Sequence, residues 1–478
     1  MESALAAIVL AAGLGTRMCS RQAKVLHPLG GEPMIARGLR AIAALEPNPL
    51  VLVTGHQAEM VAAAARDAIP DLNPRFALQN EQRGTGDAAR CGMTALGDFN
   101  GDVLIAYGDM PALRIDTLRA FLAAHRSCGA TLSFISVKTG EASAYGRVVR
   151  DAAGRVQAIV EARDASPAEL AIDEVNTGVY LARAGFLRQA LEELRPDNAQ
   201  GEFYLTDIVA IARRHGDINA WLAHDEAEFA GINSREELAR MEAQLRNQIN
   251  RRLMDSGVTM VDPASAYIGE QVEIGRDSLI GPNVQIMGRS RIGKEVVIDG
   301  TAWLRDVVIG DHTHLKLGVR AEQCVIGEHC EIGPFANLRE GTHLDGHNRI
   351  GNFVETKKAR VGRGSKASHL SYLGDAVIGD ETNIGCGVIT VNYDGYDKHV
   401  TAIGDRCMVG CDTQLIAPVK VGSDVYVASG TTIVRDVPDG ALVVSDHPQR
   451  EKPGWTARWH KRHENHPKAR ANSHDHDD

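Results

Sequence analysis

The sequence predicts an α/β chain in two parts, a mostly parallel α/β domain followed by a parallel β-helix. In the first half, short apolar runs that end in polar residues alternate with segments at helical spacing. From about residue 260, aliphatic residues recur at every sixth position, which is the hexapeptide signature of a parallel β-helix. Aromatic residues make up only 5% of the chain and glycines number 48. Tight, repeated turns therefore replace a bulky core in part of the protein.

Five apolar runs in the first half have the length and composition of strands. Helical patterns at 59–69 and 116–126 lie between them, which predicts a Rossmann-like domain over residues 1–233. Ligands bind at the carboxyl edge of such sheets, so the glycines and acids that follow the strands are candidate functional groups. The runs are residues 6–13, 49–55, 102–109, 131–137 and 175–182.

A linker helix is predicted over 234–255. Ser234 and Glu237 fit a capping box, and Gly257 is a suitable stop. A helix of this length is about 30 Å long, and we expect it to join the two domains. Its aliphatic residues recur at helical spacing, at Leu238, Met241, Leu245, Ile249 and Leu253.

The six-residue period defines the β-helix, predicted over 256–446. The aliphatic residues of the period are expected to point inward, with coils stacked about 4.8 Å apart. They keep one register over three stretches, namely Ile268, Ile274, Ile280, Ile286, Ile292, Ile298 and Leu304, then Ile326, Ile332, Leu338, Leu344 and Ile350, then Ile403, Val409, Leu415, Val421, Val427 and Ile433.

The register breaks between 351 and 378 and again between 386 and 402. Breaks in a solenoid are typical of loops on one face, often the binding face, so both segments are predicted as loops. After residue 446 the chain becomes polar, basic and rich in histidine. We therefore predict a C-terminal arm and a mostly disordered tail over 447–478.

The formal net charge of −10 argues against a general nucleic-acid or anionic-membrane binder. No apolar run is long enough to span a bilayer, and the N-terminal segment is predicted to be a first strand and not a signal peptide. The eight cysteines show neither CxxC pairs nor zinc-type spacing. Reduced thiols and a cytoplasmic location are the simplest interpretation.

Residues 8–18, IVLAAGLGTRM, are an apolar strand that leads into two glycines and an arginine, a pattern suited to binding phosphate. Met18 stands where both a P-loop and a dinucleotide fingerprint need a glycine, which excludes both. The remaining pattern, LAAGLGTRM followed from Lys24 by KVLHPLGG, resembles the signature of sugar-1-phosphate nucleotidylyltransferases.

The residue types suit that chemistry, in which a sugar phosphate attacks the α-phosphorus of a nucleoside triphosphate and expels pyrophosphate. The second pKa of a phosphate monoester is about 6, so the nucleophile is ionised at pH 7 without a general base. The site must instead hold two anions and spread the charge of the transition state. Backbone N–H groups, the catalytic cations Arg17 and Lys24, and Mg²⁺ can do this.

Hard oxygen ligands suit Mg²⁺, and Asp109 follows a predicted strand at the ligand-binding edge. The resemblance pairs Asp109 with Asn233 as metal ligands. It assigns base reading to the segment LQNEQRGTGDA (78–88) and sugar reading to Gly146, Glu161 and Asn176. The full set that it implies for nucleotide and sugar is Leu10, Ala11, Ala12, Gly13, Lys24, Gln79, Gly84, Thr85, Tyr107, Gly108, Asp109, Gly146, Glu161, Asn176 and Asn233.

Three segments of the second half carry a closer resemblance: 352–375 (NFVETKKARVGRGSKASHLSYLGD), 383–395 (NIGCGVITVNYDG) and 410–419 (GCDTQLIAPV). With the first half, they resemble bacterial bifunctional N-acetylglucosamine-1-phosphate uridylyltransferase/glucosamine-1-phosphate acetyltransferases, whose β-helix is left-handed. The resemblance implies that acetyl-CoA acetylates glucosamine 1-phosphate. N-acetylglucosamine 1-phosphate then reacts with UTP to give UDP-N-acetylglucosamine, a precursor of peptidoglycan and lipid A. It also implies a homotrimer with acyl-CoA sites between subunits.

Acetyl transfer needs a neutral amine, so a base should lie beside it, and His369 is the natural candidate. Five cations between 357 and 366 form a local basic patch suited to a phosphate. By resemblance, the sugar phosphate is held by Arg339, Lys357, Tyr372 and Asn383. Acetyl-CoA is held by Cys386, Asn392, Tyr393, Cys411 and Ser429.

The chain departs from the family in the acetyl-CoA groove. Cys386 and Cys411 stand where the family often has Ala or Ser, and Asp446 replaces an arginine that can meet CoA, so Arg450 or Lys452 would have to substitute. Two alternatives therefore stay open. One is a nucleotidylyltransferase for another sugar or base, with a structural or differently acylating β-helix. The other is a zinc β-helix resembling γ-carbonic anhydrases, with ligands from His312 and His314 or His343 and His347.

Overall fold

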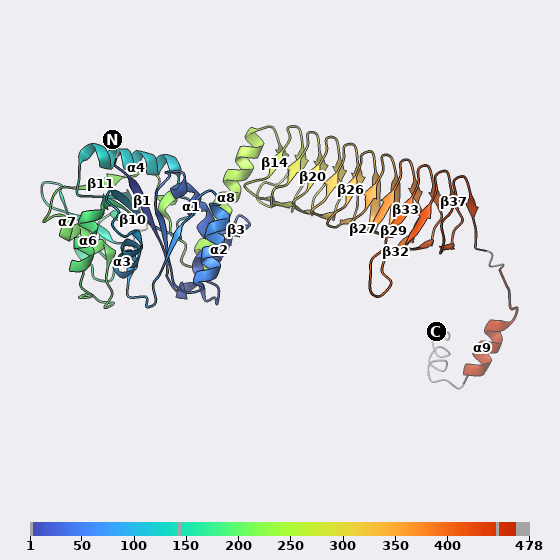
Figure 1. The fold of residues 1–478 in the computed structure, drawn as a ribbon, viewed down its shortest axis with the longest axis horizontal. Helices are drawn as coiled ribbons and strands as arrows, with labels where there is room; N and C mark the ends of the chain where they lie inside the picture. Colours follow the sequence, from blue (N-terminus) through green and yellow to red (C-terminus); the bar gives the residue numbers. More distant parts are fainter. Residues whose placement is uncertain (1–2, 141–144, 446–448, 465–478) are drawn as a thin grey trace, which may run out of the picture. The chain divides into compact units, whose positions relative to one another are not determined.

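The computed structural model describes residues 3–140, 145–445 and 449–464. The chain divides into two compact units: Met1–Asp255 with Ala266–Gln271, and Ser256–Ser265 with Val272–Asp478. Figure 1 shows an α/β unit and a column of stacked coils. Within these described ranges, no helix is both long and apolar enough to cross a membrane.

The first unit is built on a twisted sheet of order β11-β7-β10-β6-β1-β4-β5. All neighbours are parallel except β10, which is antiparallel to both β6 and β7. The strands are β1 Leu5–Ala11, β2 Pro28–Leu29, β3 Glu32–Pro33, β4 Leu50–Thr54, β5 Arg75–Leu78, β6 Asp102–Tyr107, β7 Leu132–Lys138, β8 Arg147–Arg150, β9 Val156–Val160, β10 Glu174–Arg183 and β11 Ile218–Leu222.

Helices cover both faces of this sheet, so its central strands are buried on both sides. In β1, Ile8 and Leu10 pack into one core cluster while Ala7 and Val9 pack into the other. This explains why the strand reads as a continuous apolar run. The helices are α1 Met34–Ala43, α2 Ala58–Ala68, α3 Thr85–Leu96, α4 Ile115–Cys128, α5 Pro167–Leu170, α6 Ala184–Glu193 and α7 Ile208–Ala212, with 3₁₀ turns η1 Thr16–Met18, η2 Lys24–Leu26, η3 Leu205–Asp207 and η4 Glu226–Phe229.

The predicted linker helix is present as α8, Arg235–Asp255. Its capping box has formed: the Glu237 N–H donates to Ser234 Oγ at 3.2 Å, and the Ser234 N–H donates to Glu237 Oε2 at 3.1 Å. Two orphan N–H groups of the first turn are thereby satisfied. Gly257 follows the helix at φ +97°, a conformation that suits glycine.

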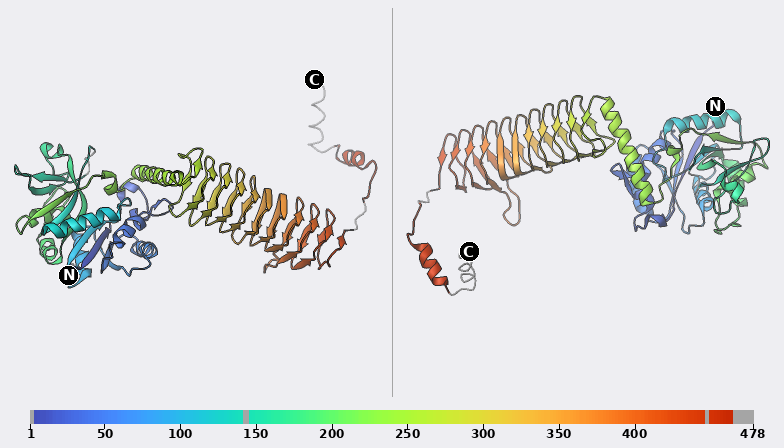
Figure 2. Two further views of the ribbon diagram at one scale, coloured as in Figure 1. Left: turned by 90° about the horizontal axis from the view of Figure 1, so that it is seen from above. Right: turned by 180° about the vertical axis from the view of Figure 1, so that it is seen from behind.

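The second unit is a parallel β-helix of stacked coils (Figures 1 and 2), and its strands form one sheet of 19 strands and one of nine. All eighteen aliphatic residues of the predicted series are buried, which confirms the six-residue register. The strands are β12 Thr259–Met260, β13 Tyr267–Ile268, β14 Glu273–Ile274, β15 Leu279–Ile280, β16 Gln285–Met287, β17 Arg291–Ile292, β18 Val297–Ile298, β19 Trp303–Arg305, β20 Val308–Ile309, β21 His314–Leu315, β22 Arg320–Glu322, β23 Val325–Ile326, β24 Glu331–Ile332, β25 Asn337–Leu338, β26 His343–Leu344, β27 Arg349–Lys357, β28 Arg360–Val361, β29 Lys366–Gly374, β30 Ala376–Ile378, β31 Asn383–Ile384, β32 Ile389–Val391, β33 Thr401–Ile403, β34 Met408–Val409, β35 Gln414–Ile416, β36 Val419–Val421, β37 Tyr426–Val427, β38 Thr432–Ile433 and β39 Leu442–Val443.

The pairing of β27 and β29 defines two faces of the β-helix. Ile350 pairs with Ala367 on the first face, which continues to Ile384 of β31. Glu355 pairs with Tyr372 on the second face, which continues to Ile389 of β32. Between the two faces, the chain turns at a row of residues with positive φ that includes Phe335, Phe353 and Leu370. We call this row, with the residue before each member, the first corner.

Two predictions for the second half need correction, namely the loop at 351–378 and the disordered tail after residue 446. The break at 351–378 is not a loop, because β27 and β29 pair side by side through it and simply continue around the first corner. The break at 386–402 does contain a loop, which follows β32 and closes with a bridge between Tyr393 and Lys398 (Figure 1). In the predicted disordered tail, Trp455–His463 form helix α9. Residues 465–478 lie outside the described residues.

Candidate functional site

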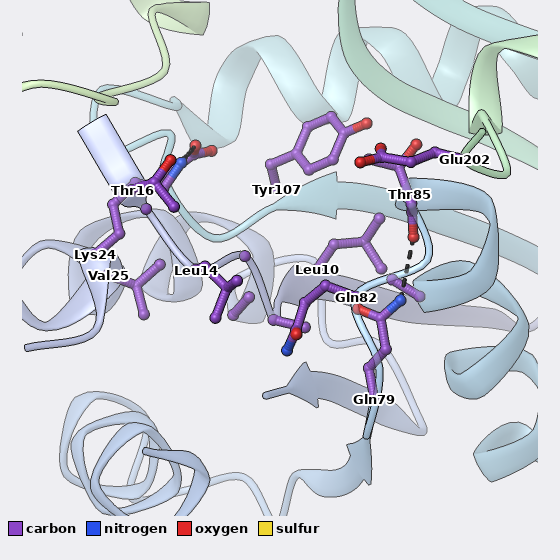
Figure 3. Close-up of a pocket in the computed structure, with 17 residues that line it drawn as sticks. Leu10, Leu14, Thr16, Lys24, Val25, Gln79, Gln82, Thr85, Tyr107 and Glu202 are labelled. Atoms are coloured by element: carbon purple, nitrogen blue, oxygen red, sulfur yellow. Dashed lines mark hydrogen bonds and ion pairs between the residues drawn. The ribbon is translucent and has the colours of Figure 1, made fainter. Parts of the chain in front are cut away.

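A cavity of about 410 Å³ opens at the carboxyl edge of the first sheet, where β1 ends in the glycine loop (Figure 3). Its wall comes from several elements: the loop after β1, η2, the segment before α3, and the end of β6. Ten predicted residues line it, namely Leu10, Ala11, Ala12, Gly13, Lys24, Gln79, Gly84, Thr85, Tyr107 and Asp109.

The glycines of the loop keep its backbone accessible. A Cβ on Gly13 would meet no atom within 4 Å, so the bare backbone faces open space in the cavity wall. Gly15 has φ +61°, and a Cβ there would lie 2.7 Å from the Cβ of Lys24. The loop can therefore approach a ligand closely while Lys24 stays packed against it.

A second cavity of about 610 Å³ shares Tyr107 and Asp109 with the first. It holds the remaining predicted residues of this site except Gly108, namely Arg17, Gly146, Glu161, Asn176 and Asn233. Among the described residues of the predicted set, Gly108 lines neither cavity; its N–H donates to the Leu10 carbonyl at 2.9 Å and joins β6 to β1. Two adjoining cavities thus meet at Asp109.

Lys24 lies at this junction. Its ammonium group contacts Asp109 Oδ2 and donates to Asn233 Oδ1 at 2.9 Å. The Asn233 amide is oriented by its own Nδ2, which donates to the Gly231 carbonyl at 3.4 Å. Two oxygen atoms therefore converge on one cation, and they are the kind of hard ligands that Mg²⁺ accepts. The lysine ammonium stands in for such a cation, so Asp109 and Asn233 fit a metal site.

Burial raises the pKa of Glu161 in the second cavity, although the Thr206 hydroxyl, which donates to Glu161 Oε1 at 3.1 Å, works against the shift. Burial also raises the pKa of Tyr107 far above its ordinary value, so its hydroxyl remains protonated. Asn176 is fixed by its neighbours: Nδ2 donates to Tyr180 Oη at 2.7 Å, and Oδ1 accepts from the Gly178 N–H at 3.1 Å.

Several residues that line the cavities were not predicted from the sequence. Gln82 and Glu202 line the first cavity, and Arg240 and Gln244 of α8 line the second. Gln82 belongs to the segment already singled out for base reading, so its position gave a usable signal. Glu202 and the α8 residues had none, because only the tertiary fold brings them to this edge.

In the second unit, His369 lies on the first corner beside Asn352 of the preceding coil. The two residues are in register between β27 and β29, and His369 Nδ1 lies 2.9 Å from Asn352 Oδ1. The same corner continues through Cys386 and Cys411, because backbone hydrogen bonds link these positions from coil to coil. The Asp412 N–H donates to the Cys386 carbonyl, and the Gly430 N–H donates to the Cys411 carbonyl. His369, Cys386, Cys411 and Ser429 therefore follow one another along one edge.

The predicted sugar-phosphate residues do not gather at that corner. Arg339 and Tyr372 lie on the second face. Arg339 follows strand β25 and donates to Glu355 Oε1 at 2.8 Å, and Glu355 is in register with Tyr372. Lys357 ends the second-face part of β27, whereas Asn383 lies on the first face, in register with Lys366. Within one chain, Asn383 is thus separated from the others by the corner.

The basic patch predicted over 357–366 is largely neutralised. Lys357, Arg360 and Arg363 each lie 3.1 Å from a carboxylate, which belongs to Glu340, Asp345 and Glu328, respectively. Three of the five cations therefore have acidic partners, and the binding of a phosphate at this patch stays a prediction. The six-residue period placed acids in register on neighbouring coils, a relation that a linear scan for charge does not include.

The predicted acetyl-CoA residues beyond the corner lie around the loop after β32. Asn392 is buried and its amide donates to Asp375, whereas Tyr393 is exposed and its hydroxyl donates to the Gly395 carbonyl at 2.6 Å. Asp446 lies outside the described residues. Arg450 and Lys452 are exposed.

The histidines considered as zinc ligands have other partners. His314 Nε2 lies 2.7 Å from Asp299, and His312 and His347 stack on either side of His329. Within the part of the chain that the structure describes, no three His, Cys, Asp or Glu side chains gather in a way that could hold a metal ion. The zinc alternative therefore finds no support. The eight cysteines are free thiols.

Comparison with known proteins decides between the remaining alternatives. Residues 6–226 match the nucleotidyl transferase family and residues 263–433 match the GMPPB C-terminal domain. The bifunctional protein GlmU of Pelobacter propionicus is 50% identical over 96% of this chain and 99% of its own length. This chain belongs to the GlmU family. The GlmU proteins of Trichlorobacter lovleyi (46% identical over 94% of this chain and 97% of the relative) and Corynebacterium efficiens (44% over 95% and 94%) are similar along the same extent. Family membership confirms a bifunctional enzyme with uridylyltransferase and acetyltransferase activities.

Proposed function

We propose that this GlmU enzyme makes UDP-N-acetylglucosamine at two separate sites, with uridylyl transfer at the paired cavities of the first unit and acetyl transfer at the first corner of the β-helix. The observation that carries the proposal is the junction of the two cavities, where Lys24, Asp109 and Asn233 meet. One cavity can take the nucleotide of UTP and the other the N-acetylglucosamine 1-phosphate. The reacting phosphates would then meet beside a cation.

Charge neutralisation carries the first reaction. The nucleophile is a phosphate that is already ionised, so no base needs to act on it. Lys24, Arg17 and the backbone of the glycine loop bind and orient the two anions. Mg²⁺, held by Asp109 and Asn233, would neutralise charge on the triphosphate.

A base carries the second reaction. When Asn352 Oδ1 accepts from the Nδ1–H of His369, Nε2 holds the lone pair of the imidazole. Nε2 can then take a proton from the amine of glucosamine 1-phosphate as the amine attacks the thioester of acetyl-CoA. The C–N bond forms, the C–S bond breaks, and CoA leaves as the thiol after it takes up that proton. Cys386, Cys411 and Ser429 would border the acetyl-CoA groove along the same edge.

A homotrimer would complete the acetyl-transfer site. The predicted ligands lie on both sides of the first corner, so one subunit cannot surround a small substrate with all of them. Large apolar side chains also line this corner, with exposed fractions of 47%, 50%, 58% and 58% for Leu317, Phe335, Phe353 and Leu370. A continuous apolar row is typical of a surface that another protein covers. We also propose that the enzyme acts in the cytoplasm, where its free thiols would stay reduced.

Two substitutions test the separation of the sites. His369→Ala should lower acetyl transfer by about 10²–10⁴-fold and leave uridylyl transfer intact, whereas Asp109→Ala should do the reverse. Acetyl transfer is followed by thiol release from acetyl-CoA, and uridylyl transfer by pyrophosphate release. His314→Ala, which removes a half-buried histidine of the same β-helix away from the first corner, is the matched control. Loss of both activities through one substitution in well-folded protein would contradict the proposal.

A further inference from the structure

The side-chain amide of Gln79 is held in one orientation. Gln79 is only 4% exposed, and its backbone N–H donates to the Thr54 carbonyl at 2.9 Å. Its Nε2 donates to the Gly84 carbonyl at 3.1 Å and to Asp87 Oδ2 at 2.9 Å. Figure 3 shows the first of these bonds as a dashed line at the wall of the first cavity.

The chemistry of the two partners dictates this orientation. A carbonyl and an ionised carboxylate only accept hydrogen bonds, so both require the NH₂ end of the amide. With both N–H groups of Nε2 engaged, Gln79 has only its carbonyl oxygen left to offer a ligand. Rotating the amide by 180° would set that oxygen against two acceptors. The cavity therefore presents a fixed hydrogen-bond acceptor at Gln79.

We propose that Asp87 is a positioning residue that sets the base specificity of uridylyl transfer through Gln79. The proposal rests on the proposed function, in which the nucleotide base enters the first cavity. The imide N3–H of a uracil-type base donates to the fixed Gln79 oxygen. In cytosine, N3 carries no hydrogen and is an acceptor. It would face the Gln79 oxygen, also an acceptor, and no hydrogen bond could form between them. Asp87 thus selects the imide without touching the nucleotide.

Asp87 also has an ordinary structural position. It lies in the first turn of α3, where a negative charge favours the helix dipole, and its other oxygen is 3.9 Å from Arg90. A purely structural role would change the stability of the unit when Asp87 is replaced. It would not change the choice between two bases, so base discrimination is the decisive readout.

The experiment compares kcat/KM for UTP and CTP in the full-length enzyme. In Asp87→Asn, the new amide can donate to a rotated Gln79, so we expect the UTP-to-CTP ratio to fall about tenfold, which is about 1.4 kcal/mol. Asp98→Asn is the matched control. It removes an exposed carboxylate just after α3 and should leave the UTP-to-CTP ratio unchanged.

The outcomes separate this proposal from the proposed function. Unchanged acetyl transfer in the second unit and an unchanged melting curve show that each variant is folded. If Gln79→Ala lowers the ratio but Asp87→Asn does not, the positioning role of Asp87 is overturned. If Gln79→Ala also leaves the ratio unchanged, the base does not lie on Gln79, and the assignment of the first cavity fails together with the inference.

Discussion

Replacing Lys24 with methionine would remove the ammonium group that lies between Asp109 and Asn233 and leave the two oxygen ligands in place. In the protein without substrate, a divalent cation has to displace that ammonium to reach them. Lys24→Met should therefore bind the metal more tightly than the natural enzyme, although it should be a much poorer catalyst. The opposite signs of the two effects make the prediction specific.

The magnitude follows from the burial of the ion pair. The side chains of Lys24 and Asp109 are 13% and 16% exposed. Exposed ion pairs contribute about 0–1 kcal/mol, and breaking a fully buried pair costs about 3–5 kcal/mol. We take about 2 kcal/mol for this intermediate case, which is about 30-fold in affinity. Loss of the same charge from the transition state should slow uridylyl transfer by at least about 10²-fold.

Titration of nucleotide-free protein with Mn²⁺, followed by the electron paramagnetic resonance signal of the free ion, measures the metal affinity directly. Arg17→Met removes an equal charge from the same loop and serves as the control; its dissociation constant should change less than that of Lys24→Met. Asp109→Asn should weaken binding. Equal or weaker Mn²⁺ binding by Lys24→Met would refute the idea that lysine and metal compete for the same oxygens.

Three further predictions concern stability and assembly. Ile298→Ala, at a fully buried core position, should destabilise the β-helix by about 2–5 kcal/mol in urea denaturation, whereas Val308→Ala on the surface should cost far less; similar losses would contradict the inward register. Burial raises the pKa of Glu161 in the folded protein. At a pH above that pKa the buried carboxylate is ionised and lowers the free energy of unfolding. This destabilisation disappears as the pH falls to the pKa of glutamate in the unfolded chain, about 4.3. Glu161→Gln should thus raise the melting temperature by about 2 °C at pH 8 by scanning fluorimetry, with no gain near pH 4; a constant gain at both would exclude the carboxylate as the cause. Phe353→Glu should reduce the particle mass measured by light scattering and lower acetyl transfer but not uridylyl transfer. Val377→Glu, at an exposed position of β30 away from the first corner, should do neither, and an unchanged mass for Phe353→Glu would remove the first corner from the interface.

The sequence predicts the two folds well because each has a strong period. In the first unit, continuous apolar runs reveal strands buried on both faces, and the capping box at Ser234 locates the start of α8. In the second, every residue that the six-residue register identifies is buried. The antiparallel direction of β10 could not be predicted, because hydrophobic pattern carries no information about strand direction.

The sites are less predictable because they depend on neighbours that are distant in sequence. The glycine loop and Asp109 were found because they follow strands, whereas Glu202 and Gln244 reach the cavities only through the tertiary fold. The supposed loop at 351–378 shows the opposite error. A turn around a corner breaks the linear register just as a loop does, although β27 and β29 remain paired throughout.

The β-helix assigns its inward and corner positions to different places in each six-residue repeat. Ile384 and Val409 fill the interior, while Cys386 and Cys411, two residues later, stand at the edge beside the proposed base. Mutation can therefore widen, narrow or chemically change that edge with little penalty in folding. Such a scaffold lets acyl-group preference drift during evolution while the column that carries it stays intact.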